Sequence, residues 1–472
     1  MRRTNSPARI ATAAVASLAL ALLGTPAYAA DPSTYLVKDI KVGGGAKPAE
    51  LVAIGNWQTN VTLYFSADDG KTGRELWTSD GTSAGTKRVK DIRSGSRGSS
   101  PRSMTAVGKR VFFSAKDGSR GRELWVTDGT AAGTRRVKDI RPGAKGSSPR
   151  ELTAVGGTLF FTADDGAHGR ELWKSDGTSA GTLLVTNINK ASRWMDDVGA
   201  FDSETTGELT SFRGQLFFAP LLVQIGKWDG HVFSELWVSD GTEAGTKPFY
   251  GWDARSDDYD TILWPGELTK VGSRLYFRAD RDLWRSDGSE AGTRSMGEVS
   301  PYELTNVGGT LFFRGNEWPL EDGHERSTRE GLWKSNGTKA STVFVKAFPP
   351  TEPWCCQPGV TIDQLTNVDG TLYFTLDEDL WRSDGTTDGT VRIADLPAGS
   401  ITRELTSVGP SYPGRLYLTV NGALRRYWNG SFSGSYRGLS SVQHLTDVGG
   451  ELMFSATDGT HGKELWAVVE GD

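Results

Sequence analysis

Cysteine is nearly absent from the chain. Cys355 and Cys356 are the only two among 472 residues, and they are adjacent. A framework of several disulfides is therefore excluded. The one bond that these residues can form within the chain is a strained vicinal disulfide, which an oxidising compartment would favour. We predict that this bond stiffens a binding loop; two free thiols or a crosslink between chains are the alternatives.

Motifs that define several enzyme classes are also absent. The chain contains no H-E-x-x-H zinc motif, no G-x-S-x-G nucleophile motif and no phosphate-binding P-loop. Its five histidines are scattered along the sequence. Pairs of carboxylates for glycoside hydrolysis can be drawn from acidic segments, but the sequence does not give the distance between them. We therefore assign no catalytic residue and no cofactor, and we favour a binding protein over an enzyme.

Long apolar runs and excess positive charge are scarce as well. Beyond the N-terminus no stretch reaches the ~18 uninterrupted apolar residues of a membrane-spanning helix, so no membrane span is expected. The formal net charge is −5, which argues against nucleic acid as a partner because such proteins carry basic surfaces.

The N-terminus has the pattern of an export signal. Arg2 and Arg3 precede a run of apolar and small residues from Ile10 to Leu23, and Ala27-Tyr28-Ala29 supplies a cleavage site. We predict a signal peptide over residues 1–29 and a secreted, extracellular or periplasmic protein over residues 30–472. Cleavage removes three arginines and no acid, so the formal charge falls from −5 to −8.

Glycine and tryptophan are plentiful, with 59 and 16 residues, and they fall in repeats. The motif ELWxxDGT returns about every 48 residues, and a degenerate copy begins at Ala423. A second motif, LTxVG or a close variant of it, also occurs nine times, beginning at Leu51, Met104, Leu152, Leu209, Leu268, Leu304, Leu365, Leu405 and Leu445. The tryptophans of the first motif are Trp77, Trp125, Trp173, Trp237, Trp284, Trp333, Trp381 and Trp466.

Each copy is predicted to form four short strands, here called A to D. In the third copy they are ELTAV, TLFFTA, RELWKS and TLLVTNI, separated by glycine-rich turns. Four strands per repeat of this length are typical of a β-propeller blade. The last copy lacks strand D, and Thr34–Ile40 matches a D strand. We predict an all-β single β-propeller of nine blades, closed by the N-terminal strand, with eight blades as the alternative.

These motifs resemble the ELWxxDGT repeat of exported bacterial proteins. The resemblance extends over nearly all of the chain after the export signal and is weakest in the sixth and eighth copies. It implies a β-propeller-like repeat architecture and no established activity.

The repeated acids are interpreted as structural. The turn aspartate of the first motif becomes Asn336 in the sixth copy, which keeps a turn-forming side chain and loses the charge. The segment DGxxGxE between strands B and C, as in Asp69–Glu75, is also interpreted as a turn, with a structural Ca²⁺ site as the alternative.

Function is expected where the repeat is interrupted. Five insertions, 189–208, 226–235, 250–267, 315–330 and 348–359, occupy D–A crossovers and B–C loops, which share one face of a propeller. They are rich in tryptophan, which stacks on sugar rings, and in carboxylates, which accept hydroxyl hydrogen bonds. The alternative is that these tryptophans pack within their own loops. The predicted ligand-binding residues are Trp194, Asp196, Asp197, Trp228, Asp229, His231, Trp252, Asp253, Trp318, Glu321, Asp322, His324 and Trp354.

The same face has a second region of different charge. The crossovers after the first two copies carry Arg93, Arg97, Arg102, Arg141, Lys145 and Arg150. The face is therefore predicted to be basic over copies one and two and acidic over copies three to seven. An acidic polymer is a ligand that the basic region would suit, but solvated charge is the commoner explanation of such a region.

Three functions stay open at this point. The first, which we favour, is a monomeric propeller that binds a glycan or a protein surface without catalysis. The second is an extracellular polysaccharide hydrolase or lyase that uses loop carboxylates. The third is a structural protein of the envelope or matrix.

Overall fold

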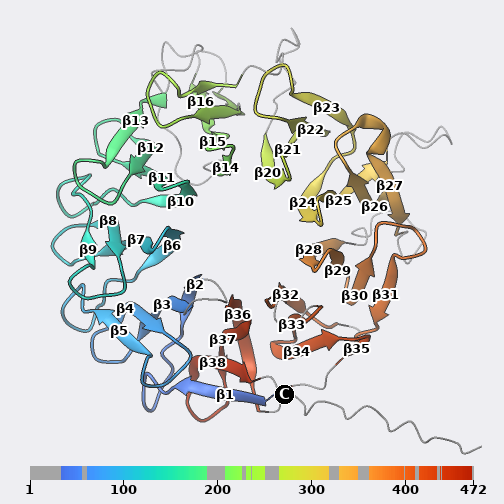
Figure 1. Ribbon diagram of the computed structural model, residues 1–472. Coiled ribbons are helices and arrows are strands. Elements are labelled where there is room, and N and C mark those ends of the chain that lie inside the picture. The colour runs from blue at the N-terminus through green and yellow to red at the C-terminus, as the bar shows by residue number, and fades with distance from the viewer. Residues whose placement is uncertain are drawn as a thin grey trace, which may run out of the picture.

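The computed structural model describes residues 33–55, 61–188, 208–225, 230–234, 236–249, 265–317, 329–348, 361–397, 399–409, 414–432, 436 and 438–469. These residues form nine four-stranded antiparallel sheets arranged as the blades of a ring (Figure 1). The prediction of a nine-bladed β-propeller is confirmed. We number the blades 1 to 9 along the chain.

Blades 1 to 3 are the most regular. Their strands are β2 (Ala49–Ile54), β3 (Thr62–Asp68), β4 (Arg74–Ser79) and β5 (Lys87–Lys90); β6 (Arg102–Val107), β7 (Arg110–Lys116), β8 (Arg122–Thr127) and β9 (Arg135–Arg136); and β10 (Arg150–Val155), β11 (Thr158–Asp164), β12 (Arg170–Ser175) and β13 (Leu183–Thr186).

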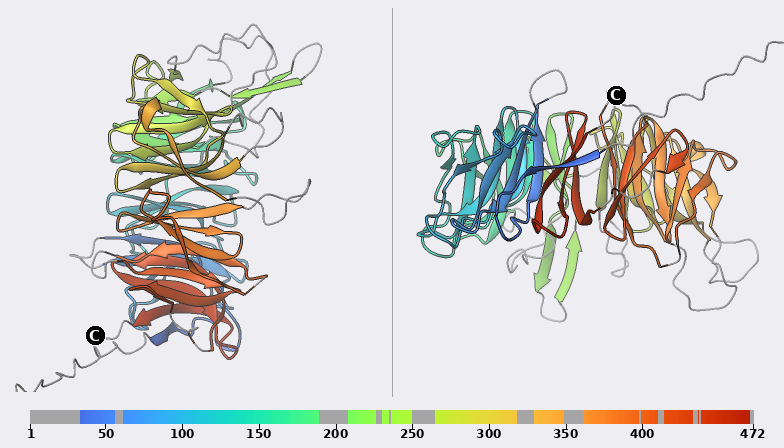
Figure 2. Two further views of the ribbon diagram at one scale, coloured as in Figure 1. Left: turned by 90° about the vertical axis from the view of Figure 1, so that its right-hand side faces the viewer. Right: turned by 90° about the horizontal axis from the view of Figure 1, so that it is seen from below.

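Blades 4 to 6 follow the same order with longer connections. Their strands are β14 (Thr210–Phe212), β15 (Gln215–Phe218), β18 (Trp237–Ser239) and β19 (Lys247–Pro248); β20 (Gly266–Val271), β21 (Arg274–Ala279), β22 (Asp282–Ser286) and β23 (Arg294–Glu298); and β24 (Tyr302–Val307), β25 (Thr310–Glu317), β26 (Arg329–Ser335) and β27 (Val343–Ala347), with a 3-10 turn η1 (Lys339–Ser341). The hairpin β16 (Leu221–Ile225) and β17 (Gly230–Ser234) lies in the B–C connection of blade 4 and projects from the ring (Figure 2).

Blades 7 to 9 complete the ring. Their strands are β28 (Ile362–Val368), β29 (Thr371–Leu376), β30 (Asp379–Ser383) and β31 (Val391–Ala394); β32 (Thr402–Ser407), β33 (Leu416–Val420), β34 (Ala423–Trp428) and β35 (Ser431–Phe432); and β36 (Ser440–Val448), β37 (Glu451–Thr457) and β38 (Lys463–Val469). The described residues contain no helix long and apolar enough to cross a membrane.

The N-terminal strand β1 (Ser33–Lys38) closes the ring, as the sequence predicts. It pairs with β38 as the outermost strand of blade 9. The hydroxyl of Tyr35 donates to Glu451 Oε1 of blade 9 at 2.9 Å and also lies 3.1 Å from the carbonyl oxygen of Gly81 in blade 1. The first strand thus supplies the fourth strand of blade 9 and joins the two ends of the chain in one sheet.

The hydrophobic core lies between the blades. One cluster joins Tyr64, Leu76 and Val89 of blade 1 to Phe113 and Trp125 of blade 2. Trp125 is buried and stacks on Phe113 with ring centroids 6.5 Å apart. Strands B and C are buried along nearly their whole length because neighbouring blades cover both sides of each sheet. The ELW tryptophan is therefore the packing residue that its recurrence predicts.

The aspartate of the ELWxxDGT motif caps the C–D turn. Asp128 Oδ1 accepts hydrogen bonds from the amide and the hydroxyl of Thr130, at 2.9 and 2.7 Å. The same arrangement recurs at Asp80, Asp176, Asp240 and Asp384. These hydrogen bonds hold the pKa of the exposed aspartates below its ordinary value. The structural interpretation of this motif is confirmed.

In every blade except blade 4, the innermost strand contains a β-bulge. One residue there has a positive φ although it is not glycine, which costs backbone energy. The members of this inner ring of residues are Glu50, Ser103, Glu151, Glu267, Glu303, Gln364, Glu404 and His444. Because of the bulge, the neighbouring backbone amide does not bond to the adjacent strand. This amide points toward the preceding blade instead.

The inner ring ties blades together. Glu267 Oε2 accepts from the amide of Leu304 in the next blade at 3.2 Å, and Glu404 Oε2 accepts from Leu445 at 2.9 Å. Further bonds of this kind are Glu50 to Ser103, Glu303 to Leu365 and Gln364 to Leu405. In blade 4, Glu208 precedes the first strand and accepts from Leu268 in the same way. At five of the eight positions the residue on the bulge thus accepts from a backbone amide of the next blade: Glu50, Glu267, Glu303, Gln364 and Glu404.

Candidate functional site

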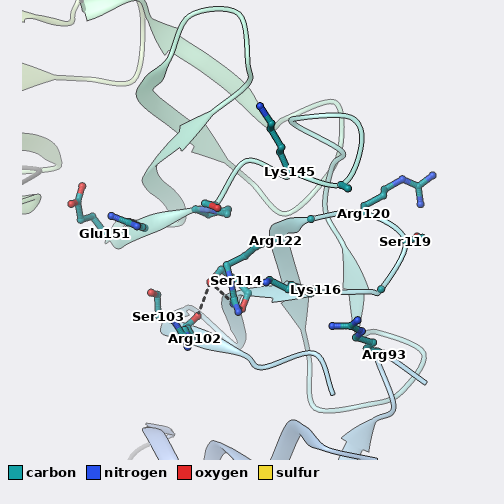
Figure 3. A pocket seen from close by; sticks show the side chains of 16 residues that line it. Arg93, Arg102, Ser103, Ser114, Lys116, Ser119, Arg120, Arg122, Lys145 and Glu151 are labelled. Carbon is teal, nitrogen blue, oxygen red and sulfur yellow. Dashed lines mark hydrogen bonds between the residues drawn. The ribbon is translucent and has the colours of Figure 1, made fainter. Parts of the chain in front are cut away.

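A cationic pocket lies where blades 2 and 3 meet on the face that carries the D–A crossovers and B–C loops. Its volume is about 870 Å³. Figure 3 shows the side chains around it, with Arg120 and Glu151 at opposite ends. One carboxylate, Glu151, stands among the charged residues that line it. The cationic side chains are Arg93, Arg102, Lys116, Arg120, Arg122, Lys145 and Arg150.

A buried glutamate holds the crossover that forms one wall of the pocket. Glu123 Oε1 accepts from the amide of Ser147 at 2.9 Å, and Oε2 accepts from the Ser147 hydroxyl at 2.5 Å. The amides of Ile140 and Arg141 also donate to this carboxylate. Burial raises the pKa of Glu123, and these hydrogen bonds oppose the rise. The carboxylate therefore fixes the loop that carries Lys145 and Arg150.

Two glycines let the crossover approach strand C at backbone distance. A Cβ on Gly121 would lie 2.2 Å from the amide nitrogen of Gly146. The amide of Ser148 donates to the carbonyl of Arg122 at 2.9 Å. Because no side chain fits between the two segments, the floor of the pocket is built from backbone and is rigid.

Arg122 lies at the base of the pocket beside a second arginine. Its Nη1 donates to the carbonyl oxygens of Ser100 and Ser114, at 2.9 and 2.8 Å. Burial, together with the neighbouring charge of Arg102, lowers the pKa of Arg122 to about 10, and the carboxylate of Glu50 opposes this shift. Two guanidinium groups that repel each other in one pocket form a site of positive potential.

Lys116 carries a positive charge at a position where the two flanking blades carry an aspartate. At the corresponding place blade 1 has Asp68, which pairs with Lys41 at 3.2 Å, and blade 3 has Asp164, which pairs with Arg141. Arg93 lies against Gly118 as Lys41 lies against Gly70, so it holds the equivalent position in blade 2. There it meets Lys116 instead of an aspartate. Blade 2 therefore has two cations, Arg93 and Lys116, where blades 1 and 3 have an ion pair.

Glu151 is an unusual carboxyl group at the other end of the pocket. Its Oε2 is buried and has no hydrogen-bond partner among the described residues. Burial raises the pKa of Glu151 to about 7, against the lowering effects of Thr162 and Arg170. At neutral pH this group therefore adds only part of a negative charge to the pocket.

The pocket includes part of the basic region that the sequence indicates. Arg93, Arg102, Lys145 and Arg150 line it, whereas Arg141 pairs with Asp164 outside it. Sequence reasoning missed Lys116, Arg122 and Ser103. Aligning the copies would have found Lys116, because SAKDG stands where blade 1 has SADDG and blade 3 has TADDG.

The predicted tryptophan- and aspartate-rich site lies outside the described residues. The backbone of His231 belongs to β17. The other twelve predicted ligand-binding residues, together with Cys355 and Cys356, fall in the undescribed segments. Their role in ligand binding stays a prediction.

The two acids of the DGxxGxE segment bind different parts of the backbone. Asp69 Oδ1 accepts from the amides of Lys71 and Thr72 in its own turn. Glu75 accepts from Arg93 and Ser99 in the crossover. No group of three or more His, Cys, Asp or Glu side chains within the described ranges is arranged to hold a metal ion. The Ca²⁺ alternative stays a prediction that a titration would test.

Comparisons with known proteins give no family. No protein-family model matches the chain, and no curated protein matches it. Among solved structures, a prolyl endopeptidase is 12% identical with a TM-score of 0.41, over 76% of this chain and 54% of that chain. A Mycobacterium tuberculosis puromycin-hydrolysing peptidase is 13% identical with a TM-score of 0.37, over 83% and 60%. A Pyrococcus horikoshii acylaminoacyl peptidase is 11% identical with a TM-score of 0.34, over 75% and 57%. The chain thus covers less than two thirds of each, and no activity is taken from them.

Proposed function

We propose that the chain is an exported β-propeller that binds an acidic glycan, without catalysis, on the face that carries the D–A crossovers and B–C loops. The observation that supports this most directly is the replacement of an ion pair by Arg93 and Lys116 in a pocket lined by seven cationic side chains. Gathering like charges in a concave site costs free energy, and an anionic ligand offsets that cost.

A glycan suits this pocket better than a flat protein surface. A concavity of about 870 Å³ is in the size range of sites for small molecules and sugar units. The order of the strands predicts that the tryptophans of the five insertions belong to the same face, where they would supply stacking surfaces for the rest of the polymer. A protein ligand that presents an acidic side chain is the alternative partner.

The hydrolase or lyase alternative has less support. Most glycoside hydrolases use two carboxyl groups, and the lining of the described pocket includes one, Glu151. Release of reducing ends or unsaturated products from acidic polysaccharides would replace the binding proposal with the enzymatic one.

The test uses calorimetric titration of the protein with polygalacturonate, dextran sulfate and neutral dextran. We expect binding to both anionic polymers, weakened by salt, and none to dextran. The variant Lys116→Asp recreates the pairing of blades 1 and 3 beside Arg93, so it should fold normally. Loss of one cation and gain of one anion should weaken binding by about tenfold or more, or ~1.4 kcal/mol.

Lys87→Asp is the matched control. Lys87 is exposed after the C–D turn of blade 1, on the opposite face, and the substitution makes the same change in net charge. It should leave binding unchanged. Equal loss in both variants, or none in Lys116→Asp, would refute the proposed site.

A further inference from the structure

The inner ring of residues offers an internal comparison between blades. Acceptor oxygens of Glu or Gln lie 2.6 Å from the Leu268 amide, 3.1 Å from that of Leu365 and 3.4 Å from that of Leu405. In each case the side chain belongs to the preceding blade and the amide lies beside a bulge. The fold thus contains a repeated carboxylate site that the chain itself fills.

Among the described residues, the bulge residues of blades 2, 3 and 9 do not form this bond, and the one in blade 2 faces the cationic pocket. The bulge residue of blade 2 is Ser103, whose φ of 53° matches that of the glutamates, but whose side chain is two carbons shorter. The amide of the next blade that corresponds to Leu268 and Leu365 is that of Leu152. In the described part of the chain, no side-chain acceptor reaches it. Two residues next to the Leu152 amide line the cationic pocket: Ser103, which holds the place of the acceptor in blade 2, and Glu151, which precedes Leu152 in blade 3.

Two arginines flank the same position. Arg102 precedes Ser103, and Arg150 precedes Glu151, and both line the pocket. Elsewhere the residue before the bulge is mostly uncharged or acidic: Ala49, Gly266, Tyr302, Asp363 and Gln443, with Arg403 the further cation. Arg403 stands before Glu404, which supplies its own acceptor. Cations and a missing acceptor therefore coincide in blade 2.

We propose that the pocket recognises a ligand carboxylate, which binds the Leu152 amide between Arg102 and Arg150 in the place that a glutamate fills in other blades. A uronic acid within a polysaccharide supplies this group. The inference rests on the proposed function and narrows its ligand to uronate-containing glycans. A planar carboxylate can take the amide on one oxygen and a guanidinium on the other, whereas a tetrahedral sulfate ester does not reproduce the group that the fold accommodates.

The test introduces a side chain that can accept from the Leu152 amide in place of the ligand. Ser103→Glu places a side chain at φ 53° that Glu50, Glu151 and Glu404 already tolerate at 59°, 54° and 56°. Its carboxylate should bind the Leu152 amide, keep or raise the melting temperature and weaken binding of a galacturonate oligosaccharide by at least about tenfold. Ser103→Gln should do the same without adding charge, since Gln364 serves as an acceptor in blade 7.

His444→Gln is the control, because it puts the same side chain on the bulge of blade 9, away from the pocket, and it should bind as the unmodified protein does. Wild-type protein should also prefer galacturonate oligosaccharides to sulfated oligosaccharides of equal charge. If anionic polymers bind in a Lys116-dependent manner but Ser103→Gln binds normally, or sulfate is preferred, this inference fails and the proposed function stands. If no anionic polymer binds, both fail.

Discussion

The ELW tryptophan shows how one side chain stabilises an interface between blades. Trp125 is 7% exposed and packs among residues of blades 1 and 2. Its indole nitrogen is buried and has no hydrogen-bond partner among the described residues. Its contribution therefore comes from apolar area and ring stacking, which together favour folding by several kcal/mol before entropy is counted.

Substitution of Trp125 separates packing from hydrogen bonding. We expect Trp125→Ala to lower the free energy of unfolding by about 3–5 kcal/mol, because a large cavity opens between the blades. Chemical denaturation would measure it, and a curve like that of the unmodified protein would contradict the packing role.

Trp466 provides the comparison, because its Nε1 donates to the carbonyl of Ala456 at 3.1 Å. Trp466→Phe should cost about 1 kcal/mol more than Trp125→Phe, since only the former leaves a buried acceptor without its donor.

Among the connecting elements, the D–A crossovers depend on the buried glutamate of strand C. Glu75, Glu123 and Glu464 are at most 1% exposed, and each accepts hydrogen bonds from the crossover that leaves its blade. The crossover held by Glu123 carries Lys145 and Arg150 into the pocket and that held by Glu75 carries Arg93 and Arg102, whereas the crossover held by Glu464 does not line it. The same hydrogen bonds from a strand C glutamate to a crossover thus support the pocket in some blades and not in others.

Replacing these glutamates by glutamine tests this difference. Glu123→Gln puts an amide group among donors, so we expect a loss of about 1–3 kcal/mol in stability. Anion binding should weaken as well, because Lys145 and Arg150 lose their fixed position. Glu464→Gln in blade 9 should cost similar stability and leave binding intact. Calorimetric titration of both variants with polygalacturonate measures this difference. An equal loss of binding in both would contradict the proposed link between Glu123 and the pocket.

The strands could be predicted from sequence better than the connections. Two motifs recur nine times, so the number of blades and the closing strand follow from counting. The role of Glu123 could not be derived, because its partners lie 17 to 24 residues away in a loop of no regular pattern. The bulge at Glu151 is equally hidden, since a positive φ at glutamate contradicts its local preference.

For the candidate site, the sequence indicated the face and the sign of the charge but not the pocket. Arg93 and Arg102 stand out as basic residues of crossovers. Lys116 and Ser103 matter through what they replace, an aspartate and a glutamate of the neighbouring blades. Such differences carry meaning only once the positions are known to face one another in the fold.

At the scale of the whole molecule, the ring combines acids with opposite pKa shifts. Burial raises the pKa of Glu151 and Glu464 to about 7, and also raises that of Glu75 and Glu123. The capping aspartates of the C–D turns have lowered pKa values because of their hydrogen bonds. The buried glutamates favour folding when protonated, and the capping aspartates favour it when ionised.

These shifts predict a stability maximum in mild acid. A raised glutamate contributes fully below its ordinary value of 4.5, and that contribution is lost as the pH rises through about 7. A lowered aspartate contributes fully above its ordinary value of 3.8, and that contribution is lost as the pH falls. We therefore expect the melting temperature to be highest near pH ~4–5 and to decline toward pH ~8.

Scanning calorimetry from pH 3 to pH 9 measures this profile, and Glu464→Gln is the informative variant. It removes one raised carboxyl group from blade 9, so its melting temperature should fall less steeply between pH ~5 and ~7 than that of the unmodified protein, although it is lower at pH ~5. An identical slope would mean that Glu464 stays ionised throughout, held in that form by the amides of Ile40, Lys41 and Ala46. A melting temperature that rises from pH 5 to pH 8 would contradict the assignment for the whole ring.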